Sequence, residues 1–359
     1  MRASRFLKRR CQAALLALCC TLFPILNAYA DIVVGSWNIQ RLGHGSQKSY
    51  PALAAIASKV DLLAVQEVMT EDGIGKLERQ LEKHSGESWS YLASHALGDS
   101  SYKEMYAFVW RDSAVEYSDG AVVYLDRGNR FAREPFSAKF RSKRSGAELA
   151  LGTMHVVFGK RIADRTPEIK ELANYWQWMQ DVYPRTPIVL LGDFNLPPSN
   201  AEWGPVKQYA KPLLSEGAST LSAKGHYANL YDNIWVESNT ALSISDAGII
   251  DFPKIIGWNH KKSRKHVSDH APIYMTLGNS TLGNGSVRVA PSLAVNMING
   301  LQSEEENEAR ERVRGNRNSK IYHRPDCPSY SRVSVKNRTL FESGKSAESA
   351  GYRLAGNCS

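Results

Sequence analysis

Seven short motifs in this 359-residue chain set a carboxylate, carboxamide or histidine against an apolar run. They contain Asn38 in SWNIQ, Glu67 in AVQEV, Glu104 in SYKEMY, His155 in GTMHVV, Asp193 and Asn195 in LLGDFN, Asp232 in LYDNIW, and Asp269 with His270 in VSDHAP. A polar side chain left unpaired beside a buried strand is costly. Carboxylate and carboxamide oxygens bind hard cations, and histidines transfer protons near neutral pH. The set therefore indicates hydrolysis assisted by a metal ion and by general acids and bases.

Each of these residues also has an ordinary structural explanation. Asn38 could cap a turn, Asp193 could close an Asx turn, and His155 could be a hydrogen-bonded core histidine. What the residues share is their position at the edge of an apolar run. This shared placement favours one common site.

Alternating strands and helices are predicted to position the motifs. Short apolar runs predict strands at residues 32–37, 62–65, 107–110, 149–158, 188–191, 234–236 and 272–277. Helices are predicted at residues 51–60, 75–84 and 167–182, the last with Thr166 as N-cap and with Pro167 and Glu168 in its first turn. This alternation predicts an α/β sandwich in one domain, residues 31–278.

The first 30 residues have the pattern of a secretory signal peptide. Five basic residues precede an apolar run from Cys11 to Ile25, and Ala28-Tyr29-Ala30 matches a cleavage site. The run is shorter than the roughly 20 residues of a membrane-spanning helix. We expect cleavage after Ala30, a secreted or periplasmic monomer, and no stable membrane insertion once the signal is removed.

The net charge of +9 overstates the basic character of the predicted domain. The leader holds five basic residues and no acid, the chain from Asn279 onward holds 12 basic and 8 acidic residues, and residues 31–278 hold 28 of each. Two local clusters remain as phosphate-binding candidates or as ordinary solvated surface. They are Arg127, Arg130, Arg133, Lys139, Arg141, Lys143 and Arg144 in one segment, and Lys254, Lys261, Lys262, Arg264 and Lys265 in the other.

The motifs WNIQ, QE, GDFN and SDH, in that order across residues 32–277, resemble the signature of the DNase I-like endonuclease/exonuclease/phosphatase superfamily. Two further segments, SYKEMYAFVWR (residues 101–111) and FAREP (residues 131–135), are similar to those of its secreted DNase I branch. The resemblance implies a four-layered sandwich of two packed β-sheets flanked by helices. It also implies a divalent-metal-dependent endonuclease with DNA as substrate.

The resemblance assigns roles to the motif residues. Glu67, with Asn38 and Asp269, is implied to hold Mg²⁺ or Mn²⁺. Two carboxylate–histidine pairs are implied to exchange protons with the attacking water and the leaving 3′ oxygen: His155 with Glu104, and His270 with Asp232. Asp193 and Asn195 are implied to contact the phosphate, the attacking water or a second metal ion, and Arg133 and Tyr102 to contact the DNA backbone.

Some positions depart from the family pattern. Met69 stands where the DNase I branch has an arginine that enters the minor groove, so the resemblance implies the loss of one duplex contact. Residues 219–229, which match a Ca²⁺ loop of that branch, contain no acid, and a second Ca²⁺ site retains only Asp126 and Glu134 as candidates. Bound Ca²⁺ is therefore a weaker expectation than Mg²⁺.

The C-terminal segment is predicted to be a separate mini-domain, residues 318–359, after a charged linker, residues 279–317. IYHRPDCPSY (residues 321–330) and GYRLAGNC (residues 351–358) resemble the zinc-binding module of the Ada DNA-repair protein. His323, Cys327, Ala355 and Cys358 occupy its four ligand positions. Three remaining ligands permit Zn²⁺, and an oxidising compartment permits a Cys327–Cys358 disulfide instead.

Two other classes of function fit parts of the pattern. The same signature serves phosphatases and lipid phosphodiesterases of the superfamily. A catalytically inactive protein that binds nucleic acid or an envelope component is the third class. Intact Glu67, His155, Asp193 and His270 favour an enzyme.

Overall fold

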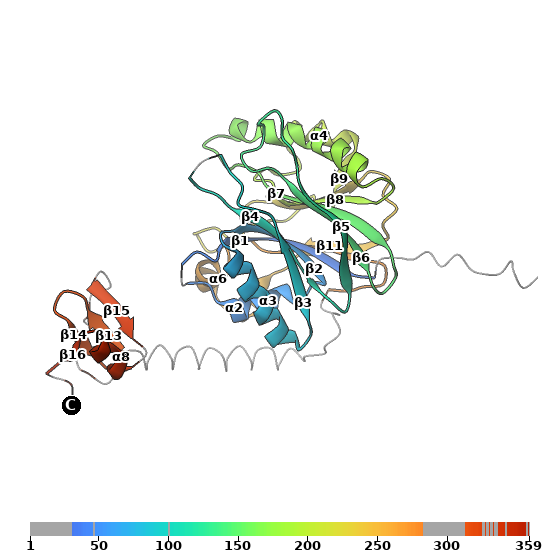
Figure 1. Cartoon of the computed structure of the whole chain (residues 1–359). Helices are drawn as coiled ribbons and strands as arrows, with labels where there is room; N and C mark the ends of the chain where they lie inside the picture. The colour runs from blue at the N-terminus through green and yellow to red at the C-terminus, as the bar shows by residue number, and fades with distance from the viewer. Residues whose placement is uncertain are drawn as a thin grey trace, which may run out of the picture. The chain divides into compact units, whose positions relative to one another are not determined.

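The computed structural model describes residues 31–45, 47–99, 101–282, 313–324, 327, 330, 333, 337–341, 343–356 and 358. Contacts divide the chain into two compact units, Met1–Val287 and Arg288–Ser359 (Figure 1). The predicted leader and most of the predicted linker lie outside the described residues.

Two six-stranded sheets form the larger unit. The first has the order β11-β12-β1-β2-β4-β3, and the second has the order β5-β6-β7-β8-β10-β9. The first sheet contains β1 (Val33–Leu42), β2 (Leu62–Val68), β3 (Trp89–Ala93), β4 (Met105–Arg111), β11 (Ile244–Ile249) and β12 (Ile273–Leu277). The second contains β5 (Val115–Val123), β6 (Phe136–Ser142), β7 (Glu148–His155), β8 (Ile188–Asp193), β9 (Ala210–Pro212) and β10 (Asp232–Glu237).

The two sheets share one pairing pattern. Each has a central parallel pair, β1 with β2 and β7 with β8, and every other neighbouring pair is antiparallel. β8 is buried along its whole length, as expected for a strand covered on both faces. This arrangement brings the carboxyl ends of four parallel strands to one edge of the sandwich.

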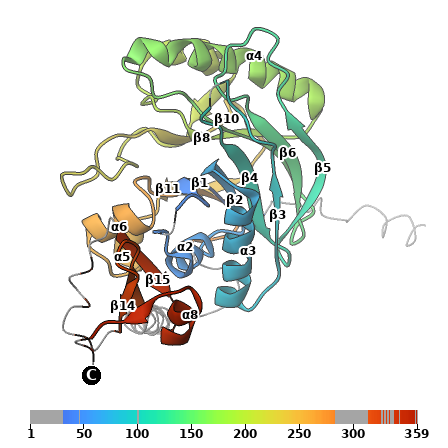
Figure 2. The same ribbon diagram turned by 60° about the vertical axis from the view of Figure 1, so that its left-hand side comes forward.

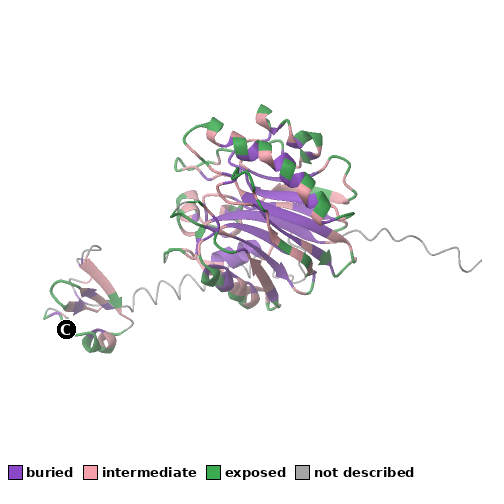
Figure 3. Ribbon diagram, turned by 45° about the horizontal axis from the view of Figure 1, so that its top comes forward, coloured by how far each residue is buried: buried purple, intermediate pink, exposed green. Residues whose placement is uncertain are grey.

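Helices cover the outer faces of both sheets, as Figure 1 shows. The first sheet carries α2 (Tyr50–Ala57) and α3 (Glu71–Ser85), and the second carries α4 (Thr166–Val182). The strands are mostly buried, whereas the outer helices expose one side (Figure 3). The predicted four-layered α/β sandwich is therefore confirmed. Among the described residues, no helix combines the length and the apolar character that a membrane span requires.

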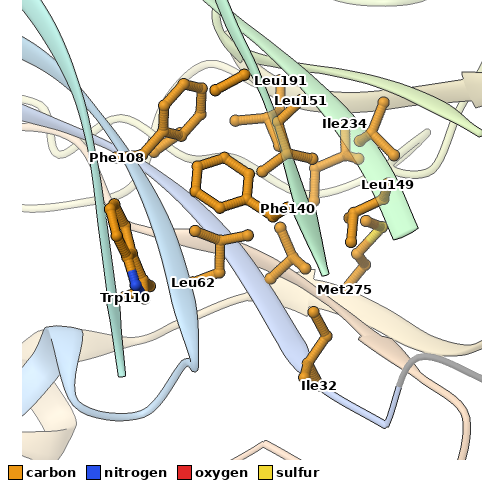
Figure 4. Close-up of a cluster of buried hydrophobic side chains, with 14 of the residues drawn as sticks. Ile32, Leu62, Phe108, Trp110, Phe140, Leu149, Leu151, Leu191, Ile234 and Met275 are labelled. Atoms are coloured by element: carbon orange, nitrogen blue, oxygen red, sulfur yellow. The ribbon is translucent and has the colours of Figure 1, made fainter. Parts of the chain in front are cut away.

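Apolar side chains fill the space between the sheets (Figure 4). Phe108 of β4 contacts Phe140 of β6 edge to face, with ring centroids 5.1 Å apart. A second cluster joins the second sheet to α4, where Trp176 is fully buried. Burial of this apolar area is the main force that holds the layers together.

The predicted strands correspond to β1, β2, β4, β7, β8, β10 and β12. β7 ends at His155, three residues before the predicted end at Phe158. Apolar runs did not indicate β3, β5, β6 and β11. β5 has half-buried and exposed positions after its first residue, so its sequence lacks the continuous apolar run of a central strand.

The beginning of α4 differs from the prediction. Thr166 is the first helical residue rather than the N-cap, and the N-cap position is occupied by Arg165. Arg165 is buried and makes no side-chain cap, because its guanidinium donates to the carbonyls of Phe158 and Asn195. Glu168 is also buried, and its carboxylate accepts the backbone N–H groups of Ala132 and Val157.

Much of the basic segment 127–144 is paired surface. Lys139 and Arg141 contact Glu148, and Arg144 pairs with Asp61 at 2.9 Å. β6 runs away from the edge at which the parallel strands end, because Phe136 pairs with Thr153 near the end of β7 and Arg141 pairs with Glu148 at its beginning. The segment as a whole is therefore not one phosphate-binding surface.

The basic segment 254–265 is compact, in contrast. It contains α5 (Phe252–Ile255) and α6 (His260–His266), which precede the SDH motif (Figure 2). Lys261 and Lys265 are exposed on α6, and Arg264 pairs with Asp269 at 3.1 Å. This second basic cluster is therefore adjacent to the motif residues.

The smaller unit has a four-stranded sheet of order β15-β13-β14-β16. Its elements are β13 (Val313–Asn316), β14 (Ile321–His323), β15 (Arg338–Phe341), α8 (Gly344–Ser349) and β16 (Arg353–Leu354). We expected this unit to begin at Asn318, but β13 pairs with β14 and β15, so it includes residues from Val313 onward. The sequence of β13, VRGN, lacks the apolar run that predicts a strand.

A disulfide joins Cys327 to Cys358 in the smaller unit. Of the two alternatives for these cysteines, the structure therefore contains the disulfide. The ligand atoms of His323, Cys327 and Cys358 also lie within 4.8 Å of one another. The resemblance to the Ada module is not confirmed, and zinc binding stays a prediction.

Candidate active site

The predicted catalytic residues meet at one edge of the two sheets. Asn38 and Glu67 come from β1 and β2, and His155 and Asp193 are the last residues of β7 and β8. Glu104, Asp232 and His270 stand at or just before the first residues of β4, β10 and β12. Because these three strands are antiparallel to the central pairs, their beginnings lie beside the carboxyl ends of the parallel strands.

The register places Asp193 between two of its partners. Asp193 pairs with His155 across the parallel β7–β8 ladder and with Asp232 across the antiparallel β8–β10 ladder. The preceding Gly192 has φ +155°, and a Cβ there would lie 2.1 Å from the carbonyl oxygen of Met154. Only glycine permits this close approach, which explains the residue before Asp193 in the GDFN motif.

Three side chains converge on one oxygen of Asp193. Asn38 donates from Nδ2 to Asp193 Oδ2 at 3.1 Å. The Nε2 atoms of His155 and His270 lie 3.6 Å and 3.5 Å from the same oxygen. Burial raises the pKa of Asp193, but the charges of His270 and His155, together with hydrogen bonds from Asn195 and Asn38, lower it below its ordinary value. Asp193 is therefore a buried anion held between two imidazoles.

Glu104 orients His155 from the opposite side of its ring. The Nδ1 atom of His155 lies 2.8 Å from Glu104 Oε1, and Glu104 is fully buried. Burial lowers the pKa of His155, but the charge and hydrogen bond of Glu104, with a contribution from Asp193, raise it to about 9. Nδ1 is thereby engaged, and Nε2 points toward Asp193.

Asp232 orients His270 in the same way. The Nδ1 atom of His270 lies 2.8 Å from Asp232 Oδ2. Burial lowers the pKa of His270, but the charges of Asp232 and Asp193 raise it well above its ordinary value. Trp37 fixes the backbone here, because its Nε1 donates to the carbonyl of His270 at 2.7 Å. Both predicted carboxylate–histidine pairs are thus present in the structure.

Glu67 and Asn38 form the cation-binding candidate. Asn38 donates from Nδ2 to Glu67 Oε1 at 3.0 Å, and the backbone N–H of Arg41 donates to Glu67 Oε2 at 3.0 Å. Asn38 Oδ1 is buried and has no hydrogen-bond partner among the described residues. A carboxylate and a carboxamide oxygen without a hydrogen-bond partner are the types of ligand that Mg²⁺ prefers. The residues therefore fit a divalent cation.

Asp269 is less available than the sequence suggested. Its Oδ2 accepts from Gln40 Nε2 at 2.9 Å and from Arg264 Nη2 at 3.1 Å. A different cluster, Asp193 with Asp232 and His270, has ligand atoms within 4.8 Å of one another. The role of Asp269 as a metal ligand stays a prediction.

Asn195 contacts the protein rather than open space. Its backbone N–H donates to Asp193 Oδ1 at 2.9 Å, and its Nδ2 donates to the carbonyl of Val156 at 2.8 Å. Its φ of +51° lies in the left-handed region, which asparagine tolerates better than most residues. In this structure the hydrogen bonds of Asn195 connect the Asp193 carboxylate to the backbone of the segment after β7.

Arg133 also contacts protein groups in place of the expected phosphate. Its Nε lies 2.9 Å from Glu104 Oε1, its Nη2 donates to the carbonyl of His155 at 2.9 Å, and 11% of its side chain is exposed. Arg133 therefore positions Glu104. Tyr102 is 39% exposed, and its hydroxyl lies 3.4 Å from Glu104 Oε2.

Asp126, a candidate for calcium binding, accepts hydrogen bonds from the backbone of its own loop. Its carboxylate accepts the backbone N–H groups of Gly128, Arg130 and Phe131. These bonds explain the aspartate without an ion. Calcium binding stays a prediction without support from this geometry.

Several residues that support the site were not identified from the sequence. Gln66 is fully buried and donates from Nε2 to Ser36 Oγ at 3.0 Å and to Thr153 Oγ1 at 2.8 Å, which links the two sheets. The hydroxyl of Ser268 donates to the carbonyl of Asn38 at 2.6 Å. Both belong to recognised motifs, QE and SDH, so their motif positions were the available signal.

Lys48 had no sequence signal. Its Nζ donates to the carbonyl of Val267 at 2.6 Å. Burial lowers the pKa of Lys48 to about 8, while the charges of Asp269 and Glu67 oppose that change. This lysine is therefore a cation within the electrostatic range of the Glu67 and Asp269 carboxylates.

Known proteins resemble this chain in sequence. Residues 35–203 match the model of the endonuclease/exonuclease/phosphatase family. The chain is 48% identical over 269 residues to a protein named deoxyribonuclease from Thioalkalivibrio sp. (strain K90mix), with 72% of this chain and 74% of that protein covered. It is 28% identical to human deoxyribonuclease-1, with 74% of this chain and 97% of that protein covered.

Solved structures show the same fold. A family protein from Bacteroides thetaiotaomicron matches with a TM-score of 0.50 and 16% identity, covering 68% of this chain and 97% of its own. A protein described as an endonuclease/exonuclease/phosphatase from Bacteroides vulgatus matches with a TM-score of 0.51 and 14% identity, covering 69% and 98%. Taken with the family model and the 48% identical relative, these results show that the chain belongs to the endonuclease/exonuclease/phosphatase family and is an enzyme of the phosphodiesterase class.

Proposed function

We propose that this chain is a secreted endonuclease that hydrolyses phosphodiester bonds in DNA and depends on a divalent metal ion. The observation that carries the proposal is the convergence of His155 and His270 on Asp193, with Nε2–Oδ2 distances of 3.6 Å and 3.5 Å. Hydrolysis of a phosphodiester needs one group to take a proton from water and another to protonate the leaving oxygen. Two imidazoles whose Nε2 atoms face the same carboxylate oxygen supply two such groups.

The reaction follows from this pair. The oxygen of a water molecule forms a bond to phosphorus, and the bond from phosphorus to the 3′ oxygen breaks. One imidazole accepts the proton of the water, and the other donates a proton to the leaving 3′ oxygen. Glu104 and Asp232 hold each ring through Nδ1, so that Nε2 is the atom that exchanges protons.

Asn38 and Glu67 are the residues that would hold the divalent ion. Such an ion, when bound, supplies positive charge against the phosphate oxygens. Support comes from the buried, unpartnered Asn38 Oδ1 and the adjacent carboxylate of Glu67. Mg²⁺ or Mn²⁺ is the proposed ion, because both accept oxygen ligands.

DNA as substrate is supported by two observations. The 48% identical relative and the human relative are named deoxyribonucleases. The exposed Lys261 and Lys265 of α6 lie just before the SDH motif, where they can contact phosphates on either side of the cleaved bond. Such contacts bind the backbone without reading its sequence.

Secretion is proposed from residues 1–30 alone. The basic residues, the apolar run and Ala28-Tyr29-Ala30 support removal of a signal peptide after Ala30. Export of the full chain followed by N-terminal sequencing tests this point. A mature N-terminus at Asp31 is the expected result, and an intact Met1 on the exported protein contradicts it.

Nicking of supercoiled plasmid by the purified mature chain tests the activity. We expect conversion of supercoiled plasmid to relaxed plasmid with Mg²⁺ and no conversion with EDTA. The control is the His155→Ala, His270→Ala double variant, which we expect to be inactive. Release of inorganic phosphate from an inositol lipid with the plasmid left intact, or undiminished cleavage by the double variant, would overturn the proposal.

A further inference from the structure

Phe158 is an exposed aromatic residue whose ring packs against a buried guanidinium. It lies three residues after His155, and 55% of it is exposed. The guanidinium carbon of Arg165 lies 4.3 Å from the centroid of its ring, and Arg165 itself is buried. Stacking of a guanidinium on one face of an aromatic ring orients the ring and leaves the opposite face for another partner.

Arg165 connects this ring to the catalytic groups. It donates from Nε to the carbonyl of Phe158 at 2.7 Å and from Nη1 to the carbonyl of Asn195. Asn195 in turn donates to Asp193 and to Val156. Hydrogen bonds through Arg165 and Asn195 therefore connect the backbone of Phe158 to Asp193 at the active-site edge.

Tyr231 adds a second aromatic ring beside the first. The ring centroids of Phe158 and Tyr231 are 6.4 Å apart, in an edge-on arrangement. Tyr231 directly precedes Asp232, the partner of His270, and its carbonyl accepts the N–H of Phe194 at 2.9 Å. The aromatic pair thus borders both carboxylate–histidine systems.

We propose that Phe158 is a stacking platform for an unpaired nucleobase next to the phosphate that is cleaved, so that the enzyme prefers single-stranded DNA. The inference rests on the proposed function. A base of any identity can stack on a phenyl ring, so the platform selects strandedness and not sequence. A base inside a duplex is already stacked and reaches the ring only after unstacking, which costs a few kcal/mol.

Met69 is consistent with this preference. It stands at the position where the family resemblance places an arginine that enters the minor groove of a duplex. A thioether carries no charge for the narrow groove. By that resemblance Met69 cannot make the charged contact with a duplex, while Phe158 offers a contact that a single strand can use.

The test compares wild type with Phe158→Leu and Phe158→Tyr on three substrates: a single-stranded oligonucleotide, its duplex, and a strand of the same length built from abasic residues. Leucine keeps an apolar side chain but cannot stack as a ring, and tyrosine can. For Phe158→Leu we expect kcat/KM on the base-bearing strand to fall about tenfold, mainly through KM. We expect little change on the duplex and none on the abasic strand. Phe158→Tyr should retain the activity of the wild type.

Tyr117→Leu is the matched control. Tyr117 is an aromatic residue of β5 with 41% exposure, and its strand partner Phe140 pairs with Leu149, six residues before His155 along β7. It therefore stands toward the opposite end of the second sheet. We expect its loss to leave all three substrates unaffected.

Two outcomes overturn the inference: equal loss on the base-bearing and abasic strands, or no loss on either. If wild type cleaves no strand at all, the proposed function fails separately. Fluorescence anisotropy of the labelled base-bearing and abasic strands in EDTA then still tests whether Phe158 stacks on a base. The inference requires that Phe158→Leu weaken binding of the base-bearing strand alone. Equal binding by wild type and Phe158→Leu rejects it.

Discussion

Asn38 donates from Nδ2 to Glu67 Oε1 at 3.0 Å, while its own Oδ1 is buried without a hydrogen-bond partner among the described residues. Native proteins rarely leave a buried polar atom unsatisfied unless a ligand or water completes it. The same Nδ2 also reaches Asp193 at 3.1 Å, so one carboxamide joins the cation candidate to the proton-transfer groups. A change in the position of Asn38 would therefore affect both the cation-binding candidate and Asp193.

Asn38→Ala is therefore expected to weaken metal binding. Loss of one oxygen ligand and of the bond to Glu67 should raise the Mg²⁺ concentration required for half-maximal plasmid nicking by about 10- to 100-fold. Isothermal titration with Mn²⁺ measures the affinity without substrate. Asn174→Ala, at an exposed position of α4, is the control. Unchanged metal affinity in Asn38→Ala would show that this residue is structural only.

Removal of either of the two imidazoles proposed to transfer protons should reduce turnover. We expect His155→Ala and His270→Ala each to lower kcat by about 10²- to 10⁴-fold, the range for loss of a general acid or base. His260→Ala is the control, since His260 contacts the carbonyl of Ser222 at 2.7 Å and pairs with no carboxylate among the residues that the structure describes. Comparable losses in all three variants would assign the effect to folding.

The raised pKa of His155 provides a pH prediction. NMR titration of the metal-free protein should give a pKa of about 9 for His155. In Glu104→Gln the largest raising charge is gone while burial and the smaller contribution of Asp193 remain, so we expect the pKa of His155 to fall. Because the folded pKa lies above the ordinary value of 6.5, the pair stabilises the folded state below pH 6.5 and loses this contribution as pH rises through about 9.

Stability measurements check the sign of this effect. The loss in free energy of unfolding caused by Glu104→Gln should be larger at pH 6 than at pH 10. A loss that is the same at both pH values would mean that the charge pair does not contribute.

The basic residues of α6 predict a particular salt dependence. Lys261 and Lys265 are exposed and four residues apart, so they share one face of the helix. Changing both to glutamine should reduce the slope of log K against log salt for DNA binding by about 2, or about 1 for each lost phosphate contact. Binding of DNA across a salt series, in EDTA, measures this slope.

Lys83→Gln with Lys211→Gln is the matched charge control. Lys83 is near the end of α3, and Lys211 pairs with Val236 at the end of β10 that is distant from Asp232. Both lysines are exposed and far from the site along their elements. An equal decrease in slope for the two double variants would indicate general charge attraction rather than contact at α6.

The Cys327–Cys358 disulfide predicts a local effect of reduction. The described core of the smaller unit contains few buried apolar residues, so loss of a disulfide there should cost about 2–5 kcal/mol. Limited proteolysis of the full chain should be faster at residues 313–358 after reduction, while plasmid nicking persists. Protection of the reduced chain by added Zn²⁺ would support the zinc alternative, and no change on reduction would contradict the predicted stabilisation.

The sequence alone was sufficient for the elements whose signal is local. Continuous apolar runs predicted the central strands β1, β2, β7 and β8, because a strand buried on both faces has to be apolar throughout. The ordered motifs singled out His155 and His270 as candidates, and the family resemblance that those motifs carry implied their pairing with Glu104 and Asp232, which the structure shows. Edge strands such as β5 escaped prediction because half of each strand faces water.

Contacts between distant segments were decided only by the tertiary structure. Arg133 has a charge that suits phosphate, yet it binds Glu104, because folding brings residues 29 positions apart to within 2.9 Å. Phe158 resembled the end of an apolar strand, but β7 ends at His155 and the ring stands exposed on Arg165. Local sequence determines which side chains are available, whereas the pairing register of the two sheets determines which of them share a site.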